Sequence, residues 1–391
     1  MNEIVKISDI KLSSGREFNE LSATVDGDHI FFKAPKTFEL FLVAECFVGI
    51  ALLEAMVSNR SLLVEGVAIS EALKNNLVEL QAIYSCWNAD LSRVEVHAET
   101  TSQVQPYRDV GSFFSAGVDS TYTLQRHIDE ITHLILFRAF DSGHDPESWR
   151  KRVEKQAEFA QSIDKKIIPI ETNAFDWTDG RKIASEFVHG LLLSSVGGAL
   201  GMRKVYVPSS HTYDELFPWG SHPLSDPMWS TESTEVKHDA AGLRRGEKMK
   251  EILTNSRFAD NLQTCWRSTV HNCGTCPKCA RSVLAIYLLG GTSKAFPEFQ
   301  GNDNLLHMLK AKDESGATFL EDAMILAKKS GNEKIYNTLK GYYRQYQLSL
   351  LPPLIDRCLL NNSVRRVYRK LKQPDWLRWR VTMRGANRWD I

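Results

Sequence analysis

Residues 111–124 read GSFFSAGVDSTYTL, and this stretch decides how the rest of the chain is interpreted. Its apolar start predicts a buried strand, and the residues from Ser120 onward predict a helix. A loop between a strand and a helix can direct backbone N–H groups at an anion, and the helix N-terminus adds partial positive charge. Asp119 could orient a magnesium ion or cap the helix. The other reading is an ordinary capped turn. The side chains that favour a phosphate loop are small or carry a hydroxyl: Ser115, Ala116, Gly117 and Ser120.

From residue 110 onward, short apolar runs alternate with segments of helical pattern. This alternation predicts parallel βαβ units, that is, a doubly wound α/β sheet with helices on both faces. Ligands of such sheets bind at the carboxyl ends of the strands. The expected strands span residues 110–114, 133–139, 166–171 and 204–208, and the expected helices span residues 120–131, 146–163 and 181–200. The segment VPSSHTYDE ends the fourth strand, so its polar residues are candidates for substrate contact or for capping a helix: Ser209, Ser210, His211 and Asp214.

Four of the seven cysteines lie within the segment CWRSTVHNCGTCPKC at residues 265–279. Two successive Cys-x-x-Cys steps form a knuckle, and a fourth thiolate comes from just upstream. Tetrahedral zinc needs this number and kind of ligand, and four protein ligands leave no open position for a substrate. We therefore expect a structural zinc site, with an iron–sulfur cluster and free thiols as the alternatives. His271 is expected to be a hydrogen-bonding neighbour. The expected ligands are Cys265, Cys273, Cys276 and Cys279.

The segment FFSAGVDSTYTL resembles the Ser-Gly-Gly-x-Asp-Ser loop of the N-type ATP pyrophosphatase (PP-loop) superfamily, whose members grip the pyrophosphate of ATP and transfer AMP to a substrate oxygen. The residues that match are Ser115, Gly117, Asp119 and Ser120. Ala116 departs from the motif, and its methyl group is tolerable at negative φ but obstructs the loop at positive φ. With the cysteine spacing added, residues 110–289 resemble the 7-cyano-7-deazaguanine synthase (QueC) family.

This resemblance implies an adenine nucleotide alpha-hydrolase-like, Rossmann-like fold that uses ATP, Mg²⁺ and a structural Zn²⁺. It implies a carbon–nitrogen ligase that adenylylates a carboxylate, a 7-deazaguanine-type acid, for amide or nitrile formation. The pathway would be one of specialised modification or anti-phage defence. The rival functions are a tRNA-thiolating PP-loop enzyme with an iron–sulfur cluster and a nucleotide-binding scaffold subunit without turnover.

The resemblance also implies roles for particular residues. Catalytic roles are expected for Asp119, Ser120 and His211. Phe137 and Arg138, at the end of the second strand, are expected to offer backbone groups to adenine. The expected nucleotide-binding loop consists of Ser115, Ala116, Gly117, Val118, Asp119 and Ser120. In LRRGEKMKEIL, we expect most of the charges at Arg244, Arg245 and Lys248 to form a solvated helix face, although one could neutralise pyrophosphate.

The two ends of the chain predict additional units around this central region. Residues 1–100 predict an accessory α+β domain, with a hairpin at LSATVDGDHIFFKAP, helices at 40–57 and 70–85 and a strand at 93–99. Residues 101–298 would form the ATP-binding domain. Residues 299–391 predict a helical, basic region whose tail contains Trp376, Trp379 and Trp389. This tail favours packing over nucleic-acid binding.

The composition is that of an ordinary globular protein, with 43% hydrophobic and 25% charged residues and a net charge of zero. Zero net charge disfavours a protein dedicated to nucleic acid. Glu45 and Glu54 make residues 40–57 a poor membrane span. We expect a cytoplasmic protein whose partners are ATP, a small carboxylate, and a protein target or partner subunit, with a homodimer as one form.

Overall fold

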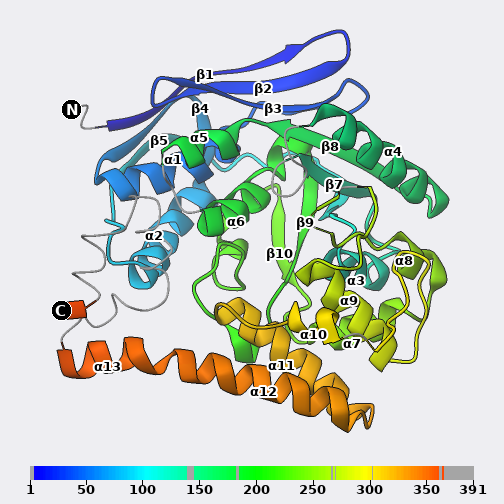
Figure 1. Ribbon diagram of the computed structural model, residues 1–391. Helices are drawn as coiled ribbons and strands as arrows, with labels where there is room; N and C mark the ends of the chain where they lie inside the picture. The colour runs from blue at the N-terminus through cyan, green and yellow to red at the C-terminus, as the bar shows by residue number, and fades with distance from the viewer. Residues whose placement is uncertain are drawn as a thin grey trace.

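The computed structural model describes residues 4–138, 145–181, 185–265, 267–268, 270–301, 303–360 and 363–364. These residues build an α/β fold around one ten-stranded, mostly parallel sheet, with helices on both faces (Figure 1). The strand order is β10-β9-β6-β7-β8-β3-β2-β1-β4-β5. The predicted α/β class with a mostly parallel sheet is therefore confirmed.

The half of the sheet that carries the SAGVDS segment consists of five parallel strands. They are β6 (Asp109–Phe113), β7 (His133–Arg138), β8 (Lys166–Thr172), β9 (Met202–Pro208) and β10 (Glu235–Asp239). The first four agree with the predicted strands, whereas β10 was not predicted. Along the chain, β7 and β8 are added on one side of β6, and β9 and β10 are then added on its other side. The reversal makes the gap between the carboxyl ends of β6 and β9 a topological switch point, where ligands of open α/β sheets bind.

Both faces of the parallel half are buried, as a parallel sheet requires. In β7, Leu134 and Leu136 enter one hydrophobic core, and Ile135 and Phe137 enter the other. The first core contains residues of α3 (Val118–Arg126), α4 (Pro146–Ser162), α7 (Arg245–Ile252), α8 (Ser256–Asn261) and α9 (Pro277–Leu288). The second core contains residues of α1 (Glu45–Ser58), α2 (Glu71–Trp87), α5 (Ala174–Gly180) and α6 (Ser185–Ser195).

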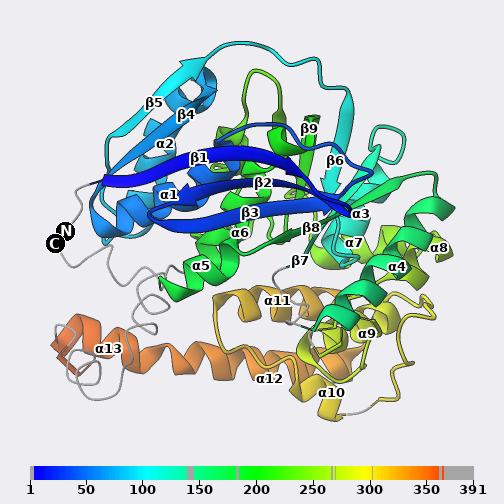
Figure 2. The ribbon, with the colours of Figure 1, turned by 90° about the horizontal axis from the view of Figure 1, so that it is seen from above.

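The N-terminal strands continue this sheet instead of forming a separate one. They are β1 (Ile4–Ser14), β2 (Phe18–Val25), β3 (Asp28–Pro35), β4 (Ser61–Ser70) and β5 (Val96–Thr101). The predicted hairpin is confirmed, and its turn places Asp26 and Gly27 at φ 50° and 90°. Strand β3 pairs antiparallel with β8 through Phe32↔Thr172 and Lys33↔Glu171. Figure 2 shows β1, β2 and β3 side by side. The elements before and after the boundary expected near residue 100 therefore belong to one sheet and share one core.

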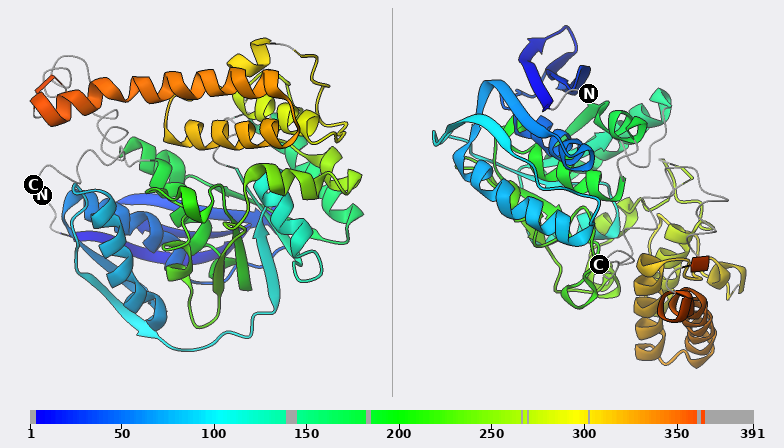
Figure 3. Two further views of the ribbon diagram at one scale, coloured as in Figure 1. Left: turned by 90° about the horizontal axis from the view of Figure 1, so that it is seen from below. Right: turned by 90° about the vertical axis from the view of Figure 1, so that its left-hand side faces the viewer.

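The chain after residue 299 is helical, as predicted, within the residues that the structure describes. Its helices are α10 (Asp303–His307), α11 (Glu314–Lys329), α12 (Glu333–Ser349) and α13 (Leu351–Leu360). These helices and the N-terminal strands lie at opposite sides of the molecule (Figure 3). Helix α11 packs against α7 and α9. The tryptophans of the basic tail lie outside the described residues.

The apolar stretch at residues 40–57 forms α1, which begins five residues later than predicted and is buried along most of its length. In the described part of the chain, we find no helix with the length and apolar character needed to cross a membrane.

A carboxylate joins the C-terminal helices to the central region. Asp322 of α11 accepts a hydrogen bond of 2.9 Å from the backbone N–H of Gly246, in the first turn of α7. Burial raises the pKa of Asp322 to about 6, from an ordinary value of 3.8. The folded protein therefore holds this proton more tightly than the unfolded chain. The free energy of unfolding therefore falls as the pH rises from about 4 to about 6. Above that range Asp322 is ionised in the folded protein, and the full cost of burying its charge is present.

We expect Asp322→Asn to raise the free energy of unfolding at pH 8 by about 2–3 kcal/mol, because asparagine keeps the acceptor oxygen and removes the buried charge. At pH 4 the variant and the parent should have equal stability. Urea unfolding at both pH values tests this, with the exposed Asp129→Asn as the control. A loss of stability at pH 8 would show that the charge itself holds α11 to α7.

Candidate functional site

The SAGVDS segment forms a compact loop at the carboxyl end of β6. Gly117 is the N-cap residue of α3. The Ser120 hydroxyl accepts a hydrogen bond from the Ser115 backbone N–H at 3.3 Å and donates one to the Gly117 carbonyl at 3.2 Å. The Gln263 backbone N–H donates to the Ala116 carbonyl at 2.7 Å, which ties the loop to the segment that follows α8. The loop is thus held in shape at the point where the first turn of α3 presents unpaired backbone N–H groups.

Ala116, the departure from the superfamily motif, adopts the conformation that we expected to obstruct the loop. Its φ is +59°, in the left-handed region that costs an alanine about 1–2 kcal/mol. Its methyl group, however, is fully buried in the core beneath the loop. Ala116 does not line the cavity above the loop, whereas Ser115 and Gly117 do. The alanine therefore strains the backbone without filling the cavity.

We expect Ala116→Gly to stabilise the protein by about 0.5–1 kcal/mol, because glycine adopts positive φ without strain but gains entropy in the unfolded chain. Nucleotide affinity should be unchanged, since the methyl group points away from the cavity. Chemical denaturation and nucleotide titration measure the two quantities. Gly242→Ala, where an added methyl group would meet no atom within 4 Å, is the control for a change of one methyl group outside the loop. A large gain in affinity for Ala116→Gly would mean that the methyl group does reach the ligand.

A cavity of about 350 Å³ lies over this loop. Its walls come from the loop, from the segment after β9, from the cysteine segment and from α11. Among the described residues that line it, cationic side chains outnumber anionic ones: Arg152, Arg245, Lys278 and Arg281 face a single carboxylate, Asp119. A cavity with this charge, at a helix N-terminus and beside the switch point, is suited to a polyanion such as a phosphate chain.

Asp119 is held by two cations of α7. Its carboxylate oxygens lie 2.5 Å from Arg245 Nη1 and 3.2 Å from Lys248 Nζ. The Lys248 ammonium is buried and also donates to the Ser209 carbonyl at 2.6 Å. Burial alone would raise the pKa of Asp119, but the charges of Arg245 and Lys248 outweigh it and hold that pKa below its ordinary value. Asp119 is therefore an ionised carboxylate at neutral pH.

These contacts correct the interpretation of the α7 charges as a solvated face. Arg245 lines the cavity, and Lys248, which is 1% exposed, lies beneath it and supports the site through its ion pair with Asp119. Only Arg244 behaves as a charge at the surface, where it pairs with Asp214 and Glu215. Arg245 and Lys248 are three residues apart, so they lie on one side of the helix. This spacing was the feature of the sequence that could have indicated a shared role.

The segment after β9 divides into residues that reach the cavity and residues that do not. Ser210 and His211 line the cavity. Ser209 lies beneath it, and Asp214 pairs with Arg244 instead. Burial lowers the pKa of His211 to about 4, so the imidazole is neutral at neutral pH. Its Nδ1 atom is buried without a hydrogen-bond partner among the described residues. His211 can therefore exchange a hydrogen bond with a ligand but brings no charge.

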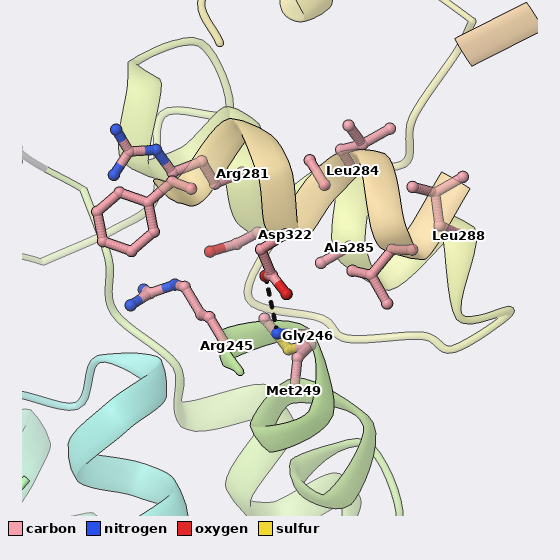
Figure 4. A pocket seen from close by; sticks show the side chains of 12 residues that line it. Arg245, Gly246, Met249, Arg281, Leu284, Ala285, Leu288 and Asp322 are labelled. Carbon is pink, nitrogen blue, oxygen red and sulfur yellow. Dashed lines mark hydrogen bonds between the residues drawn. The ribbon is translucent and has the colours of Figure 1, made fainter. Parts of the chain in front are cut away.

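The C-terminal helices complete the cavity, which the sequence did not predict. The centroid of the Phe319 ring of α11 lies 4.0 Å from the Arg281 guanidinium carbon and 5.6 Å from that of Arg245. Burial, followed by the neighbouring Arg245 charge, lowers the pKa of Arg281 to about 10. Figure 4 shows Arg245 and Arg281 extending in the same direction, with Asp322 bonded to Gly246 beside them. A small cavity of about 20 Å³ lies between α7, α9 and α11 at this junction.

The four predicted cysteine ligands come together as a cluster that could hold a metal ion. Their sulfur atoms all lie within 4.8 Å of one another. Two pairs, Cys273–Cys279 and Cys265–Cys276, are 4.0 Å and 3.9 Å apart. In a zinc tetrathiolate the sulfur atoms are about 3.8 Å apart, since Zn–S bonds are about 2.3 Å long in a tetrahedron. The donor set and spacing therefore fit such an ion.

Backbone groups around the cluster favour charged sulfur. The N–H groups of Arg267, Cys276 and Cys279 donate to cysteine sulfurs at 3.2–3.5 Å. His271 instead lies 3.0 Å from the Ser268 hydroxyl, as a hydrogen-bonding neighbour. Cys265 also lines the cavity over the loop, so the cluster and the cavity share a wall.

Several of the predicted nucleotide contacts have side chains that do not line the cavity. The Ser120 hydroxyl is engaged within the loop itself, so it holds the loop in shape instead of facing the cavity. The Val118 and Phe137 side chains are buried in the two cores. Arg138 forms an ion pair of 2.7 Å with Glu171. The predicted backbone contact to adenine is not tested by these side-chain positions and remains a prediction.

Comparisons of the chain with protein-family models, with curated proteins and with solved structures gave no match.

Proposed function

We propose that this chain is an ATP-dependent, AMP-forming enzyme, similar to the QueC family, that activates a carboxylate of the 7-deazaguanine type. The activated acid would go on to an amide or a nitrile. The observation that carries the proposal is the cationic cavity over the SAGVDS loop at the topological switch point. A doubly wound, Rossmann-like architecture and a cytoplasmic location belong to the same proposal.

In this mechanism the phosphate chain of ATP lies along the loop and the N-terminus of α3. A carboxylate oxygen of the substrate attacks the α-phosphorus, and the bond from this phosphorus to the pyrophosphate oxygen breaks. A nitrogen nucleophile then displaces AMP from the acyl-adenylate. Arg245 stabilises the charge that develops on the leaving pyrophosphate. Asp119 fixes the position of Arg245, and the buried Lys248 holds Asp119 from beneath the cavity. Mg²⁺, when bound, supplies further charge neutralisation on the phosphates.

The remaining cavity residues would bind the acid. Arg281 and Lys278, which line the cavity, would bind the carboxylate, and His211 would offer a neutral hydrogen-bonding nitrogen. Catalysis would come from positioning and charge stabilisation, with no covalent enzyme nucleophile. The cysteine cluster would hold a structural Zn²⁺ through Cys265, Cys273, Cys276 and Cys279.

One observation favours a second candidate, a nucleotide-binding subunit without turnover. Asp119 is already paired with Arg245 and Lys248, so a magnesium ion would have to compete with two cations for this carboxylate. The chain would then bind ATP and present it, or the conformation that it induces, to a partner protein.

The decisive experiment measures AMP and pyrophosphate after incubation of the purified chain with ATP, Mg²⁺ and 7-carboxy-7-deazaguanine or its amide. We expect release of both products, and Asp119→Ala should abolish it. Asp129→Ala, at an exposed carboxylate, is the control. Turnover that survives Asp119→Ala would overturn the mechanism. Tight ATP binding without AMP formation, with every deazaguanine acid supplied, would favour the second candidate.

A further inference from the structure

A second cavity, of about 300 Å³, lies away from the SAGVDS loop. Tyr107, Gly198 and Thr234 line it, and they lie shortly before β6, β9 and β10 respectively. The cavity is therefore at the amino-terminal edge of the parallel strands, opposite the edge that carries the loop. Its other wall comes from the start of α1 and the end of β4, in the N-terminal part of the chain. An occupant would contact both parts of the molecule.

The charge of this cavity is opposite to that of the first. Two carboxylates, Glu45 and Glu232, line it, and the described residues of its lining include no lysine, arginine or histidine. Burial, together with the neighbouring Glu232 charge, raises the pKa of Glu45. The Glu232 carboxylate accepts a hydrogen bond from the Ala72 backbone N–H at 2.8 Å, and its pKa is lowered. A cation between the two carboxylates would relieve their repulsion.

Several residues that line this cavity carry buried polar atoms that have no partner in the part of the chain that the structure describes. Glu45 Oε1 accepts a hydrogen bond of 3.0 Å from the Ser70 backbone N–H, but its Oε2 has no partner among the described residues. The hydroxyls of Ser194 and Ser195, which are 2% and 3% exposed, have none in that part of the chain either. Such atoms are rare in folded proteins unless water or a ligand satisfies them. These oxygens have almost no accessible surface, so an ammonium group in the cavity would reach them after side-chain rotations that turn them toward it.

The rest of the lining is aromatic on one side. Phe41 and Tyr107 both line the cavity, with ring centroids 5.0 Å apart in an edge-to-face arrangement, and Trp229 lines it as well. Aromatic rings attract cations and cover apolar ligand surface. A bare divalent ion fits less well, because the four cysteines are the only group of three or more potential ligands found within the described residues.

We propose that this second cavity binds a small organic cation, a primary amine with an aromatic or apolar body. Its ammonium group would lie between Glu45 and Glu232, near the Ser194 and Ser195 hydroxyls. Its body would lie against Phe41 and Tyr107. This site is independent of the proposed ATP chemistry, because the two cavities share no lining residue among those described.

The test titrates the full chain with tyramine and with tyrosol, which has a hydroxyl in place of the ammonium group, by calorimetry or by NMR. We expect tyramine to bind at one saturable site, about tenfold or more tightly than tyrosol, which corresponds to about 1.4 kcal/mol. Glu45→Gln should reduce tyramine to the affinity of tyrosol, because glutamine keeps the acceptor for Ser70 and removes the charge. Glu95→Gln, at an exposed carboxylate, is the control and should change nothing.

Ser195→Ala is the second variant, since it removes one hydroxyl from the end of α6 and should weaken tyramine binding several-fold without loss of the fold. Equal affinities for the two probes, or tyramine binding that survives Glu45→Gln, would overturn the proposal. Displacement of tyramine by ATP would also overturn it, because it would place the amine in the first cavity. Retained amine binding in Asp119→Ala, which should lack turnover, would separate this site from the proposed function.

Discussion

Lys248→Met is expected to lower AMP release about a hundredfold, because Asp119 and its partner Arg245 lose the buried cation that fixes their positions at the cavity. It should also lower the free energy of unfolding by about 3 kcal/mol, because Asp119 and the Ser209 carbonyl lose a buried partner. Because Arg245 remains beside Asp119, we expect the loss in the free energy of unfolding to lie at the lower end of what breaking a buried ion pair costs. Product assays and urea unfolding measure the two effects.

Two further variants separate stability from turnover. Lys250→Met removes an exposed charge from the same helix and should change neither quantity. The double variant Lys248→Met with Asp119→Asn removes both partners of this pair but leaves Arg245 without its carboxylate, so stability should return only in part while AMP release should not return. Full AMP release by a folded Lys248→Met protein would contradict the role proposed for this ammonium group.

Cys276→Ser is expected to remove one bound zinc per chain and to lower the free energy of unfolding by on the order of 5 kcal/mol. The large effect comes from the missing thiolate, which weakens the metal site. Cys276 is also the N-cap residue of α9, and serine is a favoured N-cap, so the helix start itself should be kept. Metal analysis and thermal unfolding, with and without a chelator, check the prediction.

Cys86→Ser is the matched control, because Cys86 is exposed and lies outside the cluster. The parent protein should be colourless. If the protein were brown and contained iron after anaerobic purification, the four cysteines would hold an iron–sulfur cluster instead of zinc. This result would favour the thiolation enzyme. Unchanged metal content in Cys276→Ser would remove this thiolate from the ligand set.

The parallel strands from β6 to β9 could be predicted from the sequence because each is a short apolar run between helical segments. Strand β10 could not, since its sequence EVKHD has charged or polar residues at four of five positions. It lies at the edge of the sheet, where Glu235 and Lys237 are exposed and only Val236 and Asp239 are buried. An edge strand needs little apolar surface, so its pattern is that of a loop.

The cysteine ligands and the loop could be predicted because each is local in sequence. The contribution of α11 could not, because Phe319 reaches Arg281 and Arg245 only through the packing of α11 on α7 and α9. A phenylalanine on an amphipathic helix has the pattern of an ordinary core residue. Lys248 was misjudged for a related reason, since burial of a charge depends on partners that a sequence does not reveal.

The pairing of β3 with β8 has a consequence for the order in which the chain can be assembled during synthesis. The strands meet across about 140 residues of intervening sequence, so the N-terminal hairpin emerges from the ribosome long before its partner does. Until β8 arrives, one edge of the hairpin has no neighbour; without the hairpin, β8 would expose its own edge to other chains. Removal of residues 1–100 would therefore uncover the edge of β8 at Glu171 and Thr172, and we expect the shortened chain to associate with itself more readily than the full chain.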